Sequence, residues 1–458
     1  MRLPDDTIRY IIRFLLGEGN EALASLVSYG ETDDESVRLV VIPAPPFSDG
    51  SPFSALPVPS TPLPLVEQTP LLFGDPVVQP SADGRLRIYA DIIASSWFLL
   101  ADCEPQLSPP SSFDRHGRFV GKSSLSARAG FLDVPLVDRY GVLLRSWLRA
   151  AAVHVAEPSP AFSAVNLTTD LDAPFFSRSL RSLCRELLYA SPLRHGKGYP
   201  LHALRSLMGK TSDDPFFTLP LLTSLRGRLQ QSLHDECMVR QWLFVRSLIP
   251  GTTDSPFDSP RYSLQDRDLQ FILHYCRSNG INVGLHVSYS AADNPSLIAQ
   301  ESIRLQQAVH DPVCHTRFHY LRFPSRPSAD IAQCLVRAGI TDDWSPAYAD
   351  TAGFRLGTSR PVRYIDPLTG TLLPLTLHPL TIMDCTLSDP AYMHLSEEEA
   401  VELVIRLARQ VRTHRGEFNL LFHNHTLAAP YELARMDNNY HRRLLQAIPH
   451  ALKNSPVL

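Results

Sequence analysis

Residues 161–172 read AFSAVNLTTDLD, a short apolar stretch that runs directly into two aspartates. Apolar runs of this length predict a buried β-strand. Asp170 and Asp172 stand two residues apart, and alternate residues of an extended chain point to the same side. The sequence therefore predicts two carboxylates side by side at the end of a strand.

The same pattern recurs downstream, where short apolar strands alternate with helices that carry start and stop signals. The strands are predicted at 281–286 (INVGLH), 317–323 (RFHYLRF) and 418–423 (FNLLFH), and the helices begin near Ser263, Asn294, Ser328 and Ser396. Repeated βα units indicate a parallel sheet with right-handed crossovers. About 300 residues of this pattern favour an α/β fold closed into a (β/α) barrel over an open sheet.

The residues before this pattern predict a smaller α/β domain. A helical face is expected at residues 8–16, a strand at 37–42, and helices at 88–100 and 137–153. A Pro-rich segment, 43–80, can be neither helix nor central strand and is expected to pack in extended form over this domain. The predicted division is residues 1–158 for the N-terminal domain and 159–458 for the barrel.

Composition excludes several classes of protein. Lys and Arg total 43 against 47 Asp and Glu, so no basic excess points to nucleic acid. The 7 cysteines contain no C-x-x-C pair, which argues against a disulfide framework or a cysteine zinc site. Charges interrupt each apolar run near the N-terminus, so neither a secretory signal nor a membrane span is expected. A cytoplasmic location is the resulting expectation.

Histidines lie at the predicted strand ends together with the two aspartates. His286 ends one strand, His319 lies in the next, and His423 ends the last. Catalytic groups of parallel βα folds gather at the carboxyl ends of the strands. Zinc takes about three nitrogen or oxygen ligands and leaves a position for water, so this set suits a hydrolytic metal site. The alternatives are that Asp170 and Asp172 cap a turn or helix, and that the histidines are ordinary core or loop residues.

The ordered segments TTDLD, GLHVSY, RFHYLRF, GFRLGTSRPVRYID, PLTIMDCTL and LLFHN resemble those of the polysaccharide deacetylase superfamily. The N-terminal segments IYADIIASSWFLL, FDRHGRF and GFLDVPLVDRY resemble a divergent bacterial branch in which a domain of unknown function precedes the deacetylase-like domain. The resemblance implies a distorted (β/α) barrel that holds a divalent metal, usually zinc. It also implies hydrolysis of N-acetyl groups on amino sugars.

The resemblance assigns roles to individual residues. Asp170 matches the catalytic base and Asp172 a metal ligand, although the family typically has T-F-D-D there. His286 matches the first histidine of the second motif, whereas Ser290 stands where the family has another histidine; His319 is the candidate for the third ligand. Arg355, in a glycine-rich loop, matches an arginine that orients the catalytic aspartate. His423 matches the general acid.

The function expected on this basis is deacetylation of an N-acetylated glycan or glycan precursor in surface polysaccharide metabolism. Two alternatives remain open. A degenerate barrel without metal would be a carbohydrate-binding or scaffolding protein. A glycoside hydrolase would need a second carboxylate about 5–9.5 Å across the cleft from Asp170. No feature of the sequence indicates an oligomeric state.

Overall fold

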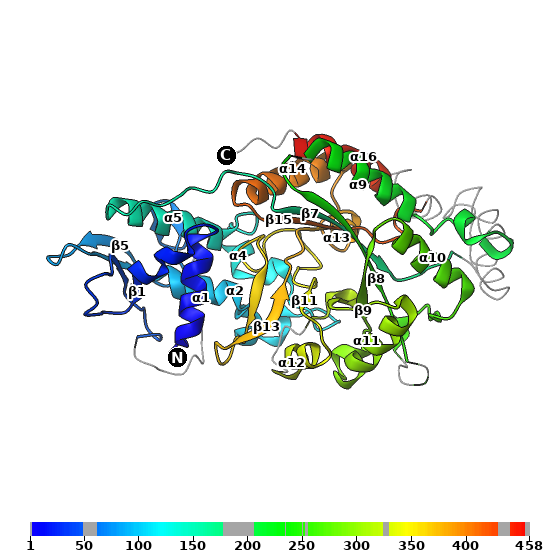
Figure 1. The fold of residues 1–458 in the computed structure, drawn as a ribbon, viewed down its shortest axis with the longest axis horizontal. Helices are drawn as coiled ribbons and strands as arrows, with labels where there is room; N and C mark the ends of the chain where they lie inside the picture. The colour runs from blue at the N-terminus through cyan, green and yellow to red at the C-terminus, as the bar shows by residue number, and fades with distance from the viewer. Residues whose placement is uncertain are drawn as a thin grey trace.

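The computed structural model describes residues 2–48, 62–176, 206–233, 235–249, 251, 255–323, 329–428 and 440–453. A four-stranded sheet and a nine-stranded sheet organise these residues (Figure 1). We call the part around the smaller sheet, up to residue 158, the N-terminal unit. The nine-stranded sheet begins at Ala164.

The N-terminal unit is a small α/β structure, as predicted. Its sheet has the order β1-β2-β6-β5, in which β5 is an antiparallel edge strand. The strands are β1 (Val27–Tyr29), β2 (Leu39–Val41), β5 (Gly74–Pro80) and β6 (Leu86–Ala90), and a separate hairpin pairs β3 (Leu65–Val66) with β4 (Thr69–Pro70). The main helices are α1 (Asp5–Leu16), α2 (Ile92–Leu100) and α5 (Leu136–Ala150).

Two predictions for this unit need comment. The helix predicted at 88–100 begins only at Ile92, because Asp91 caps it by accepting a hydrogen bond from the Ala94 amide at 2.8 Å, and Ile88 belongs to β6. Within the Pro-rich segment, residues 49–61 lie outside the described residues. The end of that segment forms β5 at the sheet edge, where proline is tolerated because no neighbouring strand needs its missing amide.

The nine-stranded sheet has the order β12-β13-β11-β10-β9-β8-β7-β15-β14. Neighbouring strands are parallel except for β12 and β13, which are antiparallel. Figure 1 shows the sheet curling, and its end strands β12 and β14 do not pair with each other within the described residues. The predicted distorted barrel is therefore confirmed, in the form of an open half-barrel. The strands are β7 (Ala164–Leu171), β8 (Met238–Val245), β9 (Asn282–Val287), β10 (His315–Phe318), β11 (Asp342–Asp343), β12 (Val362–Ile365), β13 (Leu372–Leu377), β14 (Ile382–Met383) and β15 (Glu417–Leu421).

Helices surround the convex side of the sheet (Figure 1). Buried leucines and valines of α9, α14 and α16 pack with apolar residues of β7 and β15 in one cluster. Within the described ranges, each helix is too short or too polar to cross a bilayer. The helices are α9 (Leu219–Leu233), α10 (Arg267–Ser278), α11 (Ser296–Val309), α12 (Ala329–Arg337), α13 (Asp384–Ser388), α14 (Glu397–Thr413) and α16 (Tyr440–Lys453), with short helices α3 (Glu104–Leu107) and α4 (Leu125–Arg128) in the N-terminal unit.

The strand predicted at 317–323 is shorter than expected. β10 ends at Phe318, and the chain then turns sharply, with positive φ angles of 60° at Tyr320 and 55° at Leu321. His319 therefore follows the strand directly instead of lying within it. This position puts its imidazole at the end of the sheet, where strand alternation no longer determines its direction.

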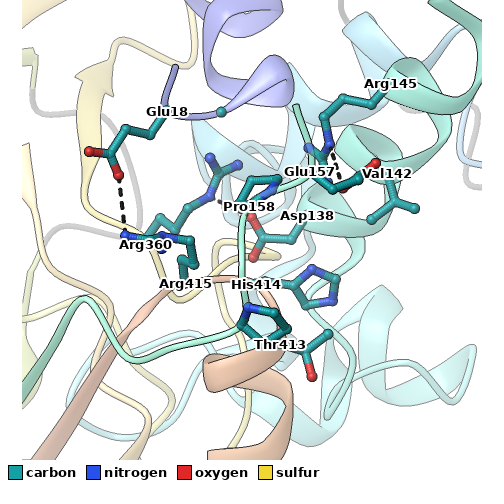
Figure 2. Close-up of a pocket in the computed structure, with 12 residues that line it drawn as sticks. Glu18, Asp138, Val142, Arg145, Glu157, Pro158, Arg360, Thr413, His414 and Arg415 are labelled. Atoms are coloured by element: carbon teal, nitrogen blue, oxygen red, sulfur yellow. Dashed lines mark hydrogen bonds and ion pairs between the residues drawn. The ribbon is translucent and has the colours of Figure 1, made fainter. Parts of the chain in front are cut away.

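The N-terminal unit packs tightly on the barrel. A single cluster of buried apolar residues contains Leu99 and Val137 of the N-terminal unit together with Leu356 and Val362 of the barrel. Between α1, α5 and the end of α14 lies a cavity of about 290 Å³. Figure 2 shows that opposite charges pair around it: Arg145 with Glu157 at 3.2 Å, Arg360 with Asp138 at 2.7 Å and Arg415 with Glu18 at 3.6 Å. The domain boundary at residue 158 stays a prediction.

Candidate metal centre and catalytic site

Asp172, His286 and His319 converge at the carboxyl ends of three strands. Asp172 follows β7, His286 lies near the end of β9, and His319 follows β10. The Asp172 Oδ1 atom is 3.2 Å from His286 Nε2 and 3.3 Å from His319 Nε2. Their ligand atoms all lie within 4.8 Å of one another. Two imidazoles and one carboxylate are a donor set that zinc accepts, so these residues fit a divalent metal.

The tautomer of His286 follows from its partner. His286 is fully buried, and its Nδ1 is 2.9 Å from the backbone oxygen of Arg317. Because a carbonyl oxygen can only accept, Nδ1 carries the proton and donates it. In the neutral ring this leaves the lone pair of Nε2 directed at Asp172, which is the form that binds a metal.

A buried carboxylate, Asp258, lies near the other ring nitrogen of His319. Its Oδ1 lies 3.6 Å from His319 Nδ1 and also accepts the Tyr289 amide at 2.7 Å, while its Oδ2 accepts the Ser290 hydroxyl at 2.8 Å. Although burial would raise the pKa of Asp258, its contacts with His319, Tyr289 and Ser290 hold that pKa at about 2. Ser290, at the position where the resemblance implies a histidine, thus contacts the carboxylate that lies beside His319.

Asp172 is strongly ionised. Burial would raise its pKa, but the neighbouring imidazoles of His319, His286 and His423 hold it well below its usual range. The same contact works in reverse on His319: burial would lower the pKa of that imidazole, and the charge of Asp172 raises it instead. A metal ion bound between Asp172 and His319 would replace the proton that the carboxylate stabilises on this imidazole.

Asp170 is held by an arginine that sequence reasoning missed. Arg317 NH1 donates to Asp170 Oδ1 at 3.0 Å and to Thr168 Oγ1 at 2.7 Å. Its Nε donates to the Trp344 backbone oxygen at 3.0 Å, and its guanidinium lies 4.5 Å over the Phe244 ring. The guanidinium is therefore fixed, and Asp170 with it. Arg317 lies in the predicted strand, two residues before His319, so its position near the site could have been inferred from the sequence.

The prediction that Arg355 orients Asp170 is contradicted by the structure. Arg355 NH2 pairs with Asp102 Oδ2 of the N-terminal unit at 2.7 Å, and its NH1 donates to the Ala347 backbone oxygen. The glycines around it allow close approach to the N-terminal unit and not to a ligand. A Cβ at Gly353, where φ is +147°, would lie 2.6 Å from the Leu132 oxygen.

His423 lies beside the other oxygen of Asp172, with its Nε2 3.7 Å from Asp172 Oδ2. Its Nδ1 is 2.8 Å from Asp384 Oδ1, and Asp384 Oδ2 accepts the His423 amide at 2.8 Å. Burial would lower the pKa of His423, but Asp384 and Cys385 raise it well above its usual range. Sequence reasoning missed the part played by Asp384, although it directly follows strand β14 and so carries the same strand-end signal as Asp172.

Asp384, Cys385 and His423 form a second group whose ligand atoms lie within 4.8 Å of one another. Here Asp384 and His423 already bond to each other, and burial raises the pKa of the Cys385 thiol to about 11. A thiol must lose its proton to bind a metal. This second group therefore suits a metal less well than Asp172, His286 and His319.

A cavity of about 350 Å³ opens onto both groups. Its lining includes Asp170, Asp172, His286, His319 and His423, together with Tyr320 and Tyr392. Residues 115, 116 and 118 of the N-terminal unit complete the wall. The cavity thus combines carboxylates, imidazoles and aromatic rings in one concave space, which is typical of a small-molecule site.

A family model matches the N-terminal part of the chain. Residues 23–152 match the model of DUF7033, described as a family of unknown function. This agrees with the expected N-terminal domain of unknown function. No curated protein matches the chain.

Among solved structures, the chain is similar to the family 4 carbohydrate esterase from Streptomyces lividans in complex with acetate. Identity is 13%, the match covers 64% of this chain and 88% of that chain, and the TM-score is 0.27. At that TM-score the match carries no argument about activity, which has to come from the side chains of this chain.

Proposed function

We propose that the chain is a metal-dependent hydrolase that removes N-acetyl groups from a glycan or glycan precursor, in surface polysaccharide metabolism in the cytoplasm. One observation carries the proposal: Asp172, His286 and His319 converge within 4.8 Å, with Asp170 and His423 beside them in the same cavity. The resemblance of the sequence motifs to polysaccharide deacetylases supports the choice of reaction and substrate.

Asp172, His286 and His319 would hold the divalent metal, for which zinc is the usual choice. When bound, such an ion polarises a carbonyl group and lowers the pKa of a water molecule towards 7. The protein contributes the geometry: a hydrogen bond to the Arg317 backbone oxygen orients the His286 ring, and the Asp258 carboxylate lies 3.6 Å from His319 Nδ1.

Asp170 would act as the general base. One of its oxygens is occupied by Arg317, whereas the other, Oδ2, lies 3.7 Å from His286 Nε2 and faces the metal ligands. A water molecule that attacks the acetamide carbonyl must lose a proton. Asp170 Oδ2 is placed to accept it, because the Arg317 contact leaves that oxygen free.

His423 would act as the general acid. Its proton is stabilised by Asp384, and its Nε2 points into the cavity beside Asp172. Amide cleavage requires a proton on the departing nitrogen, because a free amide anion is a very poor leaving group. An imidazolium at His423, in the same cavity as the proposed metal ligands, can deliver that proton.

Metal content tests the proposal first. Purified protein loaded with zinc and desalted should retain about one equivalent by mass spectrometry. Asp172→Ala and His286→Ala should lose it, and His274→Ala, which changes an exposed histidine on α10, should not. Undiminished metal in both site variants would remove these residues as ligands. A wild-type protein that holds no metal but binds glycan would favour the carbohydrate-binding alternative.

Measurements of activity together with metal content distinguish the proposed base, Asp170, from the proposed metal ligands. Asp170→Asn should retain the metal and lose at least about 100-fold of acetate release from an N-acetylated oligosaccharide, the typical contribution of a general base. Retained turnover would show that Asp170 is wrongly assigned.

A further inference from the structure

A loop of the N-terminal unit, residues 113–119, forms part of the cavity that contains the metal ligands. The loop lies within the DUF7033 match and is closed on itself. Phe113 and Phe119 pair as an isolated bridge, and Asp114 Oδ1 accepts the amides of His116 at 2.9 Å and Arg118 at 3.0 Å. This closed geometry presents His116 and Arg118 to the barrel.

Arg118 joins three segments of the chain. Its Nε donates to Asp114 Oδ2 at 2.8 Å, its NH1 to the Tyr320 backbone oxygen at 3.0 Å, and its NH2 to the Tyr392 hydroxyl at 3.0 Å. The side chain is buried, with 7% of the residue exposed. A buried guanidinium with every contact filled is a fixed element and not a mobile surface charge.

The segment that Arg118 holds is strained. Tyr320 and Leu321 both adopt positive φ, which side chains larger than hydrogen rarely do, and they directly follow the metal ligand His319. Such conformations persist where the surroundings enforce them, and they concentrate at functional sites. The carbonyl of Tyr320 is the atom that Arg118 binds, so the restraint acts one residue from the ligand.

The barrel also contributes an arginine, Arg322, to its contact with loop 113–119. Arg322 Nε donates to the His116 backbone oxygen at 2.8 Å, and its NH1 donates to the Tyr289 oxygen at 2.8 Å. The His116 ring lies 4.8 Å from that of Tyr320, and its Nδ1 is 3.2 Å from the Tyr289 hydroxyl. Loop 113–119 and the turn after His319 therefore hold each other by one arginine from each side.

We propose that the N-terminal unit contributes to the geometry of the metal centre. Through Arg118, loop 113–119 fixes the turn that directs His319 towards Asp172 and His286. Arg118 is thus a positioning residue. This inference rests on the proposed function, since it assigns a role toward the same metal.

Zinc titration by calorimetry and the visible spectrum of the Co²⁺-loaded protein test the role. Arg118→Met removes the three contacts and should weaken zinc binding about 10- to 100-fold, the usual effect of losing a residue that orients a ligand. Its Co²⁺ absorption should change, because an imidazole leaves the coordination sphere. Arg118→Lys keeps the positive charge but loses the planar, forked guanidinium, so its zinc affinity should lie between those of the wild type and Arg118→Met.

The matched control is Arg128→Met, which removes an exposed arginine of the same unit and should leave affinity and spectrum unchanged. If circular dichroism shows that Arg118→Met does not fold, Tyr392→Phe tests the positioning role instead. This variant removes only the hydroxyl that accepts one hydrogen bond from Arg118, and it should lose zinc affinity about two- to fivefold. Wild-type affinity and spectrum in the folded Arg118 or Tyr392 variants would overturn the positioning role alone. Absence of metal from the wild type would overturn the proposed function and this role with it.

Discussion

At the residue scale, the arginine that contacts Asp170 is Arg317 and not Arg355, the one that the sequence motifs indicated. Arg317 contacts Asp170, whereas Arg355 contacts Asp102. Both guanidiniums are buried, so burial does not distinguish them. The difference lies in the carboxylate that each arginine contacts: Asp170 faces the candidate metal ligands, whereas Asp102 belongs to the N-terminal unit.

Replacement of each arginine by methionine separates these roles. Arg317→Met should lower kcat about 10- to 100-fold with metal retained, because Asp170 is no longer held in position. Arg355→Met should cost about 2–4 kcal/mol of stability, since it leaves Asp102 unpaired at a buried contact, and should spare kcat at temperatures where the protein is folded. Kinetics, metal analysis and urea denaturation of both variants provide the check. A larger kcat loss in Arg355→Met would reverse the assignment.

His378 is a residue whose charge links stability to pH. Its Nδ1 lies 2.7 Å from Glu417 Oε2 and its Nε2 2.9 Å from Asp342 Oδ1, so both ring nitrogens donate and the ring is an imidazolium. Burial would lower the pKa of His378, but the hydrogen bonds and charges of these two carboxylates raise it to about 9. The ring also stacks on Trp344 at 4.1 Å.

The raised pKa predicts the direction of the pH effect. The stabilisation is complete below about pH 6.5, where the unfolded chain is also protonated, and is lost as the pH rises towards 9. In that window unfolding releases up to one proton, so the free energy of unfolding should fall by up to about 1.4 kcal/mol per pH unit more than in His378→Gln. Urea denaturation between pH 6 and 9 measures the difference. Parallel curves for the two proteins would show that His378 does not carry this proton.

Strand ends are the elements that made the site predictable. Asp170, Asp172, His286 and His423 were placed at predicted strand ends and His319 within a predicted strand, and the structure brings all five to one cavity. A buried strand followed by a polar residue is a local signal, so the sequence contains it. Parallel pairing then brings separate ends together, and this step needs only the recognition of alternating strands and helices.

What the sequence could not provide are the partners of these residues. Asp258 reaches His319 from a short 3-10 helix at residues 256–258, and Asp384 reaches His423 from α13, with nothing in the spacing of either pair to connect them. Such contacts depend on how elements pack in three dimensions. Strands β8, β11, β12, β13 and β14 were also absent from the prediction. β11 and β14 have only two residues each, and β12 and β13 pair antiparallel without an intervening helix, so they lack the βα pattern.

The start of helix α14 follows the local capping signal by which a helix was predicted to begin near Ser396. Ser396 accepts the Glu399 amide at 3.2 Å, and the Glu399 carboxylate accepts the Ser396 amide at 2.8 Å, which is the predicted capping box. Ser396→Ala should lower stability by about 1 kcal/mol in urea denaturation and leave metal content unchanged. Glu402→Ala, at an exposed position in the same helix, should stay within about 0.5 kcal/mol of the wild type. Equal losses in both variants would contradict a specific cap.

At the scale of the whole molecule, the two units share one hydrophobic core and a closely fitted interface. Gly353 lies at that interface, where an added Cβ would meet the Leu132 oxygen at 2.6 Å. Gly353→Ala should therefore cost about 1–3 kcal/mol more than Gly84→Ala, which also has positive φ but has no atom within 4 Å of its Cβ position. Thermal denaturation of both variants tests this. A smaller loss at Gly353 would indicate that the units are not fitted to each other.

The sequence predicted both units but not their interdependence. Composition and strand periodicity are properties of each segment, whereas the contacts of Arg118, Arg322 and Arg355 join residues about 200 or more positions apart. Through these contacts, the proposed role of Arg118 would connect a domain of unknown function with a site whose candidate metal ligands all lie in the other unit.

Zinc K-edge X-ray absorption of the loaded protein tests the central assignment most directly, because it reports the atoms around the ion. Asp172, His286 and His319 predict only nitrogen and oxygen at about 2.0–2.1 Å, with the outer scattering of two imidazole rings. A sulfur atom at about 2.3 Å would show that Cys385 is a ligand and that the ion lies in the neighbouring group. That result, or a zinc ion with no imidazole scattering, would contradict the site proposed for this protein.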